Sequence, residues 1–219
     1  MIKIKRYIVF LIGLFISSLG VSIITKANLG TSPISSIPYV LSLKFSLTLG
    51  QFTILFSILL VALQLLILRK NFKLEHLLQI PISFLFGYFI DYTMILLSKM
   101  SFNKNYLFSI IFLIIGCLVL AIGVYLEVIA NVAMLPGESF VRAISDTWHK
   151  KFGTIKVIFD VSMTVIAGIL SFVFFYQLQG IREGTIVAAI LVGFIVGIFN
   201  NLFSKIKDKL LVKNRLTLM

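Results

Sequence analysis

The chain has 219 residues, of which 59% are hydrophobic and 13% charged, whereas about a quarter of the residues in a soluble domain are charged. This much apolar surface exceeds what a core of this size can bury, which excludes an ordinary soluble enzyme and indicates lipid as the solvent. The net charge of +12 does not indicate nucleic acid as a partner, because Lys and Arg cluster at the ends of hydrophobic runs, where they meet lipid headgroups.

The hydrophobic runs predict an all-α membrane protein with six long helices and two short ones. In chain order, the long helices are expected at residues 7–25, 51–68, 77–97, 107–128, 155–178 and 185–203, and the short ones at 33–46 and 136–148. The first run is longer than the core of a signal peptide, so we expect it to be a retained helix. Residues 204–219 alternate basic with aliphatic side chains, which predicts an amphipathic tail on the cytoplasmic leaflet.

An internal repeat divides the chain into two related halves, expected at residues 1–105 and 106–203. Gly13 aligns with Gly116 at a shift of 103 residues, and the same shift matches further Gly, Asn, Pro and Ser positions without a gap. These further pairs are Gly20 with Gly123, Asn28 with Asn131, Pro33 with Pro136, Ser36 with Ser139, and Gly50 with Gly153. After a three-residue gap, Gly87 aligns with Gly193. Each half therefore holds one long helix, a break with a short helix, and two more long helices.

The short helices decide the topology. The first is expected to have 14 residues, which extend roughly 21 Å against a hydrocarbon core of about 30 Å, so neither short helix crosses comfortably. Six crossings place most Lys and Arg on the side of both termini, as the positive-inside rule requires. We therefore favour 3+3 inverted repeats with two short broken or re-entrant helices, in a bacterial inner membrane with both termini cytoplasmic. Eight crossings in parallel repeats are the alternative.

Segments in both halves resemble the YczE/YitT family of bacterial membrane proteins. They are the stretch from Gly20 to Pro33, Leu47-Thr48-Leu49-Gly50, Phe84 to Asp91, Gly123 to Leu126, and Gly184 to Val187. In family members the proline is often followed by Trp-Asp, whereas Ile34 and Ser35 follow Pro33 here. The resemblance covers nearly the whole chain and implies a membrane protein without a defined activity, so it predicts the class and not the substrate.

The two breaks, at residues 27–33 and 130–139, are one candidate binding site. Pro33 and Pro136 suit the first turn of a new helix, whose N-terminus attracts anionic groups, and Thr31 or Ser32 is able to cap the first of them. Broken helices at matching places mark the binding sites of transporters. The candidate binding residues in the breaks are Asn28, Ser32, Ser36, Asn131 and Ser139. The alternative is a structural turn that was duplicated.

Ionisable residues inside or beside the runs are the other candidates, because such groups are expensive in lipid and rarely face it. They are Asp91, Glu127, Glu138 and Asp160, together with Arg142 on the same short helix as Glu138. One hypothesis is that they line a polar cavity, which binds a cationic or zwitterionic solute or carries protons. The alternative is that they lie at the membrane interface, paired with Lys26, Arg142 or Lys156. Glu138 and Arg142 are four residues apart and are also able to pair with each other.

No catalytic, metal or cofactor motif is predicted. Cys117 is the only cysteine and the two histidines lie far apart, which excludes disulfides and disfavours a metal site. Gly193-x-x-x-Gly197 is expected to let helices pack closely. The leading hypothesis is a small transporter of a small polar solute, with its site at the repeat interface. One alternative is a substrate-capture subunit with an ATPase partner, and the other is a non-transporting regulatory membrane protein. A homo-oligomer is a further possible assembly.

Overall fold

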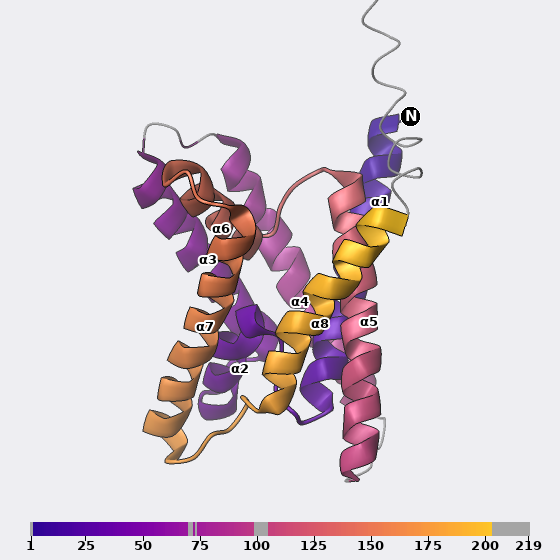
Figure 1. The fold of residues 1–219 in the computed structure, drawn as a ribbon, viewed down its shortest axis with the longest axis vertical. Helices are drawn as coiled ribbons and strands as arrows, with labels where there is room; N and C mark the ends of the chain where they lie inside the picture. The colour runs from indigo at the N-terminus through magenta and orange to yellow at the C-terminus, as the bar shows by residue number, and fades with distance from the viewer. Residues whose placement is uncertain (1, 70–71, 73, 99–104, 203–219) are drawn as a thin grey trace, which may run out of the picture.

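The structure is a computed structural model that describes residues 2–69, 72, 74–98 and 105–202 (Figure 1). Its helices are α1 (Ile2–Lys26), α2 (Pro33–Lys44), α3 (Leu49–Leu68), the 3-10 helix η2 (Leu74–Leu78), α4 (Gln79–Ser98), α5 (Tyr106–Ala130), α6 (Pro136–Thr147), α7 (Phe152–Phe175) and α8 (Glu183–Leu202). Every predicted helix is present close to its expected bounds, so the all-α architecture is confirmed. The predicted amphipathic tail, residues 204–219, lies outside the described residues.

Both short helices begin at a proline, as predicted, but a side-chain cap is absent from each. Ser32 and Leu135 are the extended N-cap residues of α2 and α6, and neither side chain bonds the helix N-terminus. The Ser32 hydroxyl lies 2.9 Å from Ser35 Oγ, and the Thr31 hydroxyl lies 3.0 Å from Thr25 Oγ1. The predicted capping by Thr31 or Ser32 is therefore wrong. Proline at the first helical position removes one of the N–H groups that a cap would otherwise satisfy.

The most extensive packing in the structure joins α1 to α5, the first helices of the two halves. Glycines allow the two backbones to approach closely. A Cβ added to Gly20 would lie 2.5 Å from the amide nitrogen of Leu120, and one added to Gly116 would lie 2.7 Å from Ile24 Cγ1. Small residues at such an interface are how helices pack tightly where lipid supplies no hydrophobic driving force. Cys117 is fully buried beside this contact, which confirms it as a core residue.

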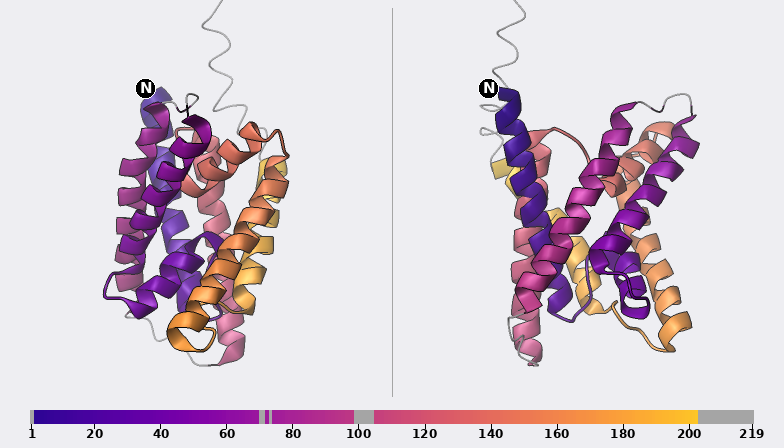
Figure 2. Two further views of the ribbon diagram at one scale, coloured as in Figure 1. Left: turned by 90° about the vertical axis from the view of Figure 1, so that its left-hand side faces the viewer. Right: turned by 180° about the vertical axis from the view of Figure 1, so that it is seen from behind.

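The eight α-helices of the described residues form two groups, each with two helices from either half (Figures 1 and 2). In the first bundle (α1, α4, α5, α8), α4 packs on α1 and α8 packs on α5. In the second bundle (α2, α3, α6, α7), α2 and α6 each pack against both α3 and α7. The bundles are joined mainly where α3 packs on α4, with a smaller contact between α2 and α8.

The short helices lie toward opposite ends of the molecule (Figure 1). The end at which α1 begins and α8 finishes is termed the terminal end, and α6 lies toward it; α2 lies toward the other, distal end. Among the described residues, five helices are long and apolar enough to cross a membrane, namely α1, α3, α4, α5 and α7. The part of α8 whose side chains are described, Glu183–Phe199, is also apolar but is shorter than these five helices.

One packing prediction is wrong in this conformation. A Cβ added to Gly193 or Gly197 on α8 meets no described atom within 4 Å beyond its own helix and chain neighbours. Both glycines are exposed, since α8 packs on α5 through a different face and stands apart from α7 (Figure 1). No helix of the described chain covers this face.

Candidate functional site

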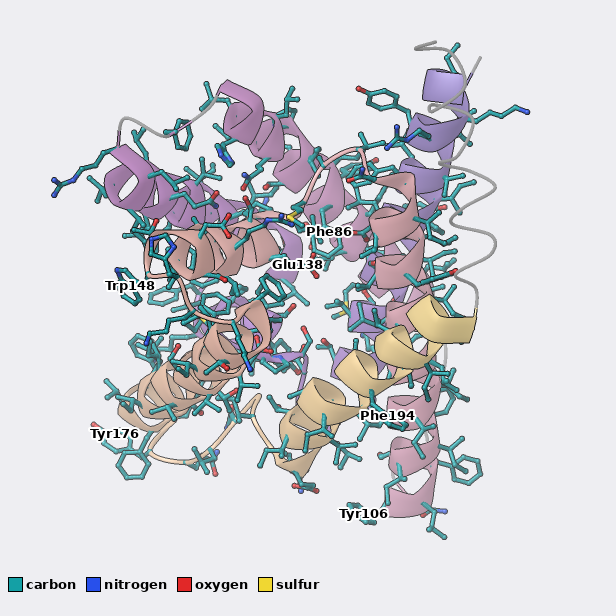
Figure 3. All side chains as sticks on the ribbon, turned by 45° about the horizontal axis from the view of Figure 1, so that its top comes forward. Phe86, Tyr106, Glu138, Trp148, Tyr176 and Phe194 are labelled. Atoms are coloured by element: carbon teal, nitrogen blue, oxygen red, sulfur yellow. The ribbon has the colours of Figure 1, made fainter. Side chains whose placement is uncertain are left out.

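Three acidic residues, Glu127 on α5 of the first bundle and Glu138 on α6 and Asp160 on α7 of the second, are together termed the acidic centre. Glu138, on the first turn of α6, lies near the middle of the view in Figure 3. Its carboxyl group interacts electrostatically with Glu127 on α5 and with Asp160 and Lys156 on α7. Glu127 is 6% exposed and accepts a hydrogen bond of 2.5 Å from the Ser17 hydroxyl. The structure thus brings three of the predicted site residues together from three helices.

The charges around the acidic centre pair in part as predicted. Lys156 Nζ lies 2.6 Å from Asp160 Oδ1, so for Asp160 the structure shows the pairing with Lys156 that was the alternative to an unpaired site residue. The predicted pairing of Glu138 with Arg142 is wrong, because Arg142 Nε lies 3.8 Å from Asp146 Oδ2. Both partners of that pair are exposed, whereas Glu138 is half-buried and turns toward α5 and α7. Arg142 therefore keeps its guanidinium in the more polar surroundings.

A second polar group, termed the amide cluster, consists of Gln64 on α3, Gln79 on α4 and Ser139 on α6. All three residues are buried. The two amides bond each other, with Nε2–Oε1 distances of 3.1 and 3.2 Å. Gln64 also donates to Pro136 O at 3.2 Å and accepts from the Ser139 hydroxyl at 3.0 Å, while Gln79 donates to Ser139 Oγ at 2.8 Å. The cluster fixes the start of α6 against both helices.

Sequence reasoning predicted Ser139 but missed both glutamines of the amide cluster. A glutamine carries no charge, so it does not stand out in an apolar run as an acid does. The available signal was an amide near the end of one predicted span, Gln64, followed by another near the start of the next, Gln79.

A cavity of about 860 Å³ opens at the terminal end beside the amide cluster. It lies between α6, the start of α4 and the linker that joins α5 to α6. Its lining includes Leu78, Gln79, Val132, Met134, Ser139 and Arg142. Two predicted residues, Ser139 and Arg142, therefore face a space large enough for a small solute.

Asn28 and Asn131 adopt a left-handed backbone conformation at the breaks, and their side-chain amides are not buried inside the protein. Both are exposed and adopt positive φ, 59° and 46°, a region in which asparagine is favoured over most residues. Their carbonyl groups accept hydrogen bonds from arginines distant in sequence. Arg182 Nη1 lies 3.3 Å from Asn28 O, and Arg6 Nη2 lies 2.8 Å from Asn131 O. Sequence reasoning missed both arginines because no local pattern links them to the breaks.

The first break is closed against the start of α8. Gly184 N donates to Leu29 O at 2.8 Å, and Thr31 N donates to Thr185 Oγ1 at 3.2 Å. Gly30 permits this approach, since its φ of 120° suits glycine and an added Cβ would overlap Thr185. The hydroxyls of the two predicted serines, Ser32 and Ser36, are engaged within the protein, with Ser36 Oγ 2.5 Å from Pro33 O.

Comparison with known proteins decides the family. Residues 4–201 match a family of unknown function, DUF6198. The chain is a DUF6198 protein. It is 28% identical to the uncharacterized protein YyaS of Bacillus subtilis over 141 residues, 64% of this chain and 69% of that protein. It is 32% identical to the uncharacterized membrane protein YczE of the same species over 142 residues, 64% of this chain and 63% of YczE.

The predicted resemblance to YczE is thereby confirmed, and this DUF6198 chain is a membrane protein of a YczE-like family. No solved structure matches it.

In this DUF6198 protein, Asp91 holds the start of α3 and does not lie in the acidic centre. Its Oδ2 accepts from the Thr48 hydroxyl at 2.6 Å, and its Oδ1 accepts from Gly50 N at 2.8 Å. Thr48 also caps α3 through a capping box with Gln51. A carboxylate placed at a helix N-terminus satisfies free N–H groups and opposes the positive end of the helix dipole.

Replacing Asp91 with asparagine is expected to lower the free energy of unfolding by about 1–2 kcal/mol, because the amide keeps only one acceptor and loses the charge. Thermal melting of the protein in detergent measures the change. Asp146→Asn is the matched control, since its ion pair with Arg142 is exposed and is worth less than about 1 kcal/mol. Equal melting of the two variants would mean that Asp91 does not stabilise α3.

Proposed function

We propose that this protein is a small secondary transporter for a small polar solute, with the acidic centre as its binding site. The observation that supports the proposal most directly is the mutual electrostatic influence of Glu127, Glu138 and Asp160, which come from three helices of a membrane protein. Ionisable groups within membrane-spanning segments are expensive and by default functional. Among the described residues, Glu138 and Asp160 share the Lys156 ammonium and Glu127 bonds the neutral Ser17 hydroxyl, so the centre favours a solute with a positive charge, or a coupling proton.

The proposed architecture is a 3+3 inverted repeat with six crossings, α1, α3, α4, α5, α7 and α8. The packing supports it through matching contacts. The contact of α1 with α4 has its counterpart in that of α5 with α8, and the contacts of α2 with α7 and α3 have theirs in those of α6 with α3 and α7. The positions of α2 and α6 toward opposite ends fit the same relation (Figure 1). Secondary transporters are commonly built from such repeats, with the solute bound between them.

We further propose that the terminal end faces the cytoplasm of a bacterial inner membrane. Basic residues of the described chain are more numerous there than at the distal end, in accord with the positive-inside rule. Those at the ends of helices near the terminal end are Lys5, Arg6, Arg69, Lys150 and Lys151, and those near the distal end are Lys26, Lys44 and Arg182. In this orientation the open cavity connects to the cytoplasm.

The test is a melting screen of the purified protein against small cations and zwitterions: amino acids, polyamines, quaternary amines and monovalent metal ions. At least one compound is expected to raise the melting temperature, since a ligand at a hundred times its Kd adds about 2.7 kcal/mol. Glu138→Gln is expected to weaken that ligand about tenfold or more, the effect of losing one charge-assisted contact. The hit is then offered to protein reconstituted in liposomes, where uptake is expected.

The control variant is Glu183→Gln, whose carboxyl group is exposed at the start of α8, and it is expected to bind like the wild type. A hit unaffected by Glu127→Gln, Glu138→Gln and Asp160→Asn would place the binding site elsewhere. Binding without uptake would favour the substrate-capture subunit. The absence of any stabilising compound would favour the regulatory alternative.

A further inference from the structure

The distal end is closed at two contacts, which together are termed the distal gate. At the first, Leu29 and Thr31 bond Gly184 and Thr185 at the start of α8, as described above. At the second, α3 meets α4 through two glycines. A Cβ added to Gly50 would overlap Gly87 O and lie 2.6 Å from Asp91 Cγ, and one added to Gly87 would lie 2.6 Å from Gly50 O. Both glycines of this contact are buried.

The positions that match the first contact lie open at the terminal end. Under the repeat shifts of 103 and 106 residues, Leu29 and Thr31 correspond to Val132 and Met134, and Gly184 and Thr185 correspond to Leu78 and Gln79. All four of these counterparts line the cavity of about 860 Å³. The cavity is thus the opened counterpart of a contact that is closed at the distal end.

The positions that match the second contact are also apart. Gly50 and Gly87 correspond to Gly153 on α7 and Gly193 on α8. Both counterparts are exposed, and an added Cβ on either meets no atom of the described chain within 4 Å beyond its own helix and chain neighbours. The closed pair and the open pair are therefore the same sequence feature in two packing states. Two independent contacts show the same difference between the ends.

We propose that the protein alternates between this conformation and a second one in which the two ends exchange their packing. In the second conformation Val132 and Met134 close on Leu78 and Gln79, and α7 packs on α8 at Gly153 and Gly193. The distal gate opens in turn, which separates α3 from α4 and α8 from the first break. The inference deepens the proposed function and rests on it, because the exchange gives the acidic centre access to each side of the membrane alternately.

The physical reason is the similarity of the two halves. Contacts that one half forms are chemically available to the other, so two packings of comparable free energy exist, and closing both ends at once would leave no path for a solute. The small residues needed for helix contact are already present on the open faces of α7 and α8. Gly153 and Gly193 lower the stability of α7 and α8, and in this conformation no helix contact compensates for that cost. The compensating contact forms in the second conformation.

Cysteine cross-linking in native membranes tests the exchange, with Cys117→Ala as the background. One double variant, Thr31→Cys with Thr185→Cys, reports the distal gate; the other, Leu78→Cys with Val132→Cys, reports closure of the cavity. Each is expected to form an intramolecular disulfide upon oxidation. Leu78→Cys with Thr185→Cys, at opposite ends, is the control and is expected to form none. Complete reaction of the distal pair while the terminal pair stays reduced would overturn the proposal.

A glycine variant supplies the second readout. Gly193→Leu is expected to leave the fold and the distal cross-link unchanged but to reduce the terminal cross-link about tenfold or more, because the added side chain blocks α7. Gly168→Leu, equally open on α7 but outside the matched pair, is expected to change neither. An unaffected terminal cross-link in Gly193→Leu would exclude the proposed closure of α7 on α8.

These measurements need no solute, so they are separate from the test of transport. If both pairs cross-link but the melting screen finds no stabilising compound, the exchange is retained and the transporter is rejected. If a solute binds at the acidic centre but the terminal pair never cross-links, the binding site is retained and the exchange is rejected.

Discussion

Replacing Gly20 with alanine is expected to lower the free energy of unfolding by about 2–3 kcal/mol. The added methyl group would lie 2.5 Å from the backbone nitrogen of Leu120 and 2.6 Å from its Cα, so α1 and α5 must separate to admit it. A flexible side chain could turn aside, but a backbone cannot. In thermal melting of the detergent-solubilised protein, the midpoint is expected to fall by roughly 4–12 °C.

The matched control for Gly20 is Gly197→Ala. Both glycines lie inside a helix, but an added Cβ on Gly197 meets no described atom within 4 Å beyond its own helix and chain neighbours. Alanine there is expected to be neutral or to stabilise by about 0.5–1 kcal/mol, since glycine disfavours helix. If Gly20→Ala melts like Gly197→Ala, close contact between α1 and α5 is not a main source of stability.

Replacing Gln64 with leucine is expected to lower the free energy of unfolding by about 2–4 kcal/mol, because four hydrogen bonds are lost and their partners stay buried. Leucine has a similar volume, so the change removes polarity with little change in packing. The partners left behind are the Gln79 amide, the Ser139 hydroxyl and the Pro136 carbonyl. Gln177→Leu is the control, since its side chain is exposed beyond the end of α7.

A double-mutant cycle separates the amide cluster from a simple effect of size. Gln79→Leu alone is expected to destabilise the protein, but adding it to Gln64→Leu is expected to remove only a little more stability, with a coupling energy of about 1–3 kcal/mol. The second leucine removes the buried donor and acceptor that the first left unpaired. Additive losses would show that the two amides act independently, contrary to the geometry.

The helices and their breaks were predictable because each depends on local chemistry. Long apolar runs are stable in lipid only as helices, and a proline such as Pro33 or Pro136 begins a new one without the loss of a bond. Which helices pack together was not predictable from the sequence of either half alone. The crossing of α1 with α5 depends on glycines such as Gly20 and Gly116 meeting the partner backbone, and such spacing occurs equally on the uncovered face of α8.

The candidate site was predictable where an unusual charge marked it. Glu127, Glu138 and Asp160 stood out in apolar surroundings, and the structure gathers them. Asp91 stood out equally, yet its carboxylate satisfies N–H and O–H groups at the start of α3, a use that depends on which helix begins beside it. The bond from Arg182 to Asn28 O spans 154 residues of chain, and no local pattern encodes such a pairing.

Each bundle combines helices from both halves of the chain, and this also bears on how the chain is assembled. α1 is synthesised long before α5, so the glycine face of α1 has no partner until more than half of the chain has been made. The same holds for α2 and α3, which wait for α7 and α6. Neither half therefore completes a bundle by itself during synthesis. Until α5 is inserted, the first four helices pack mainly through the contacts of α4 with α1 and α3 and of α2 with α3, so this interval is expected to be the period of greatest exposure to quality-control proteases.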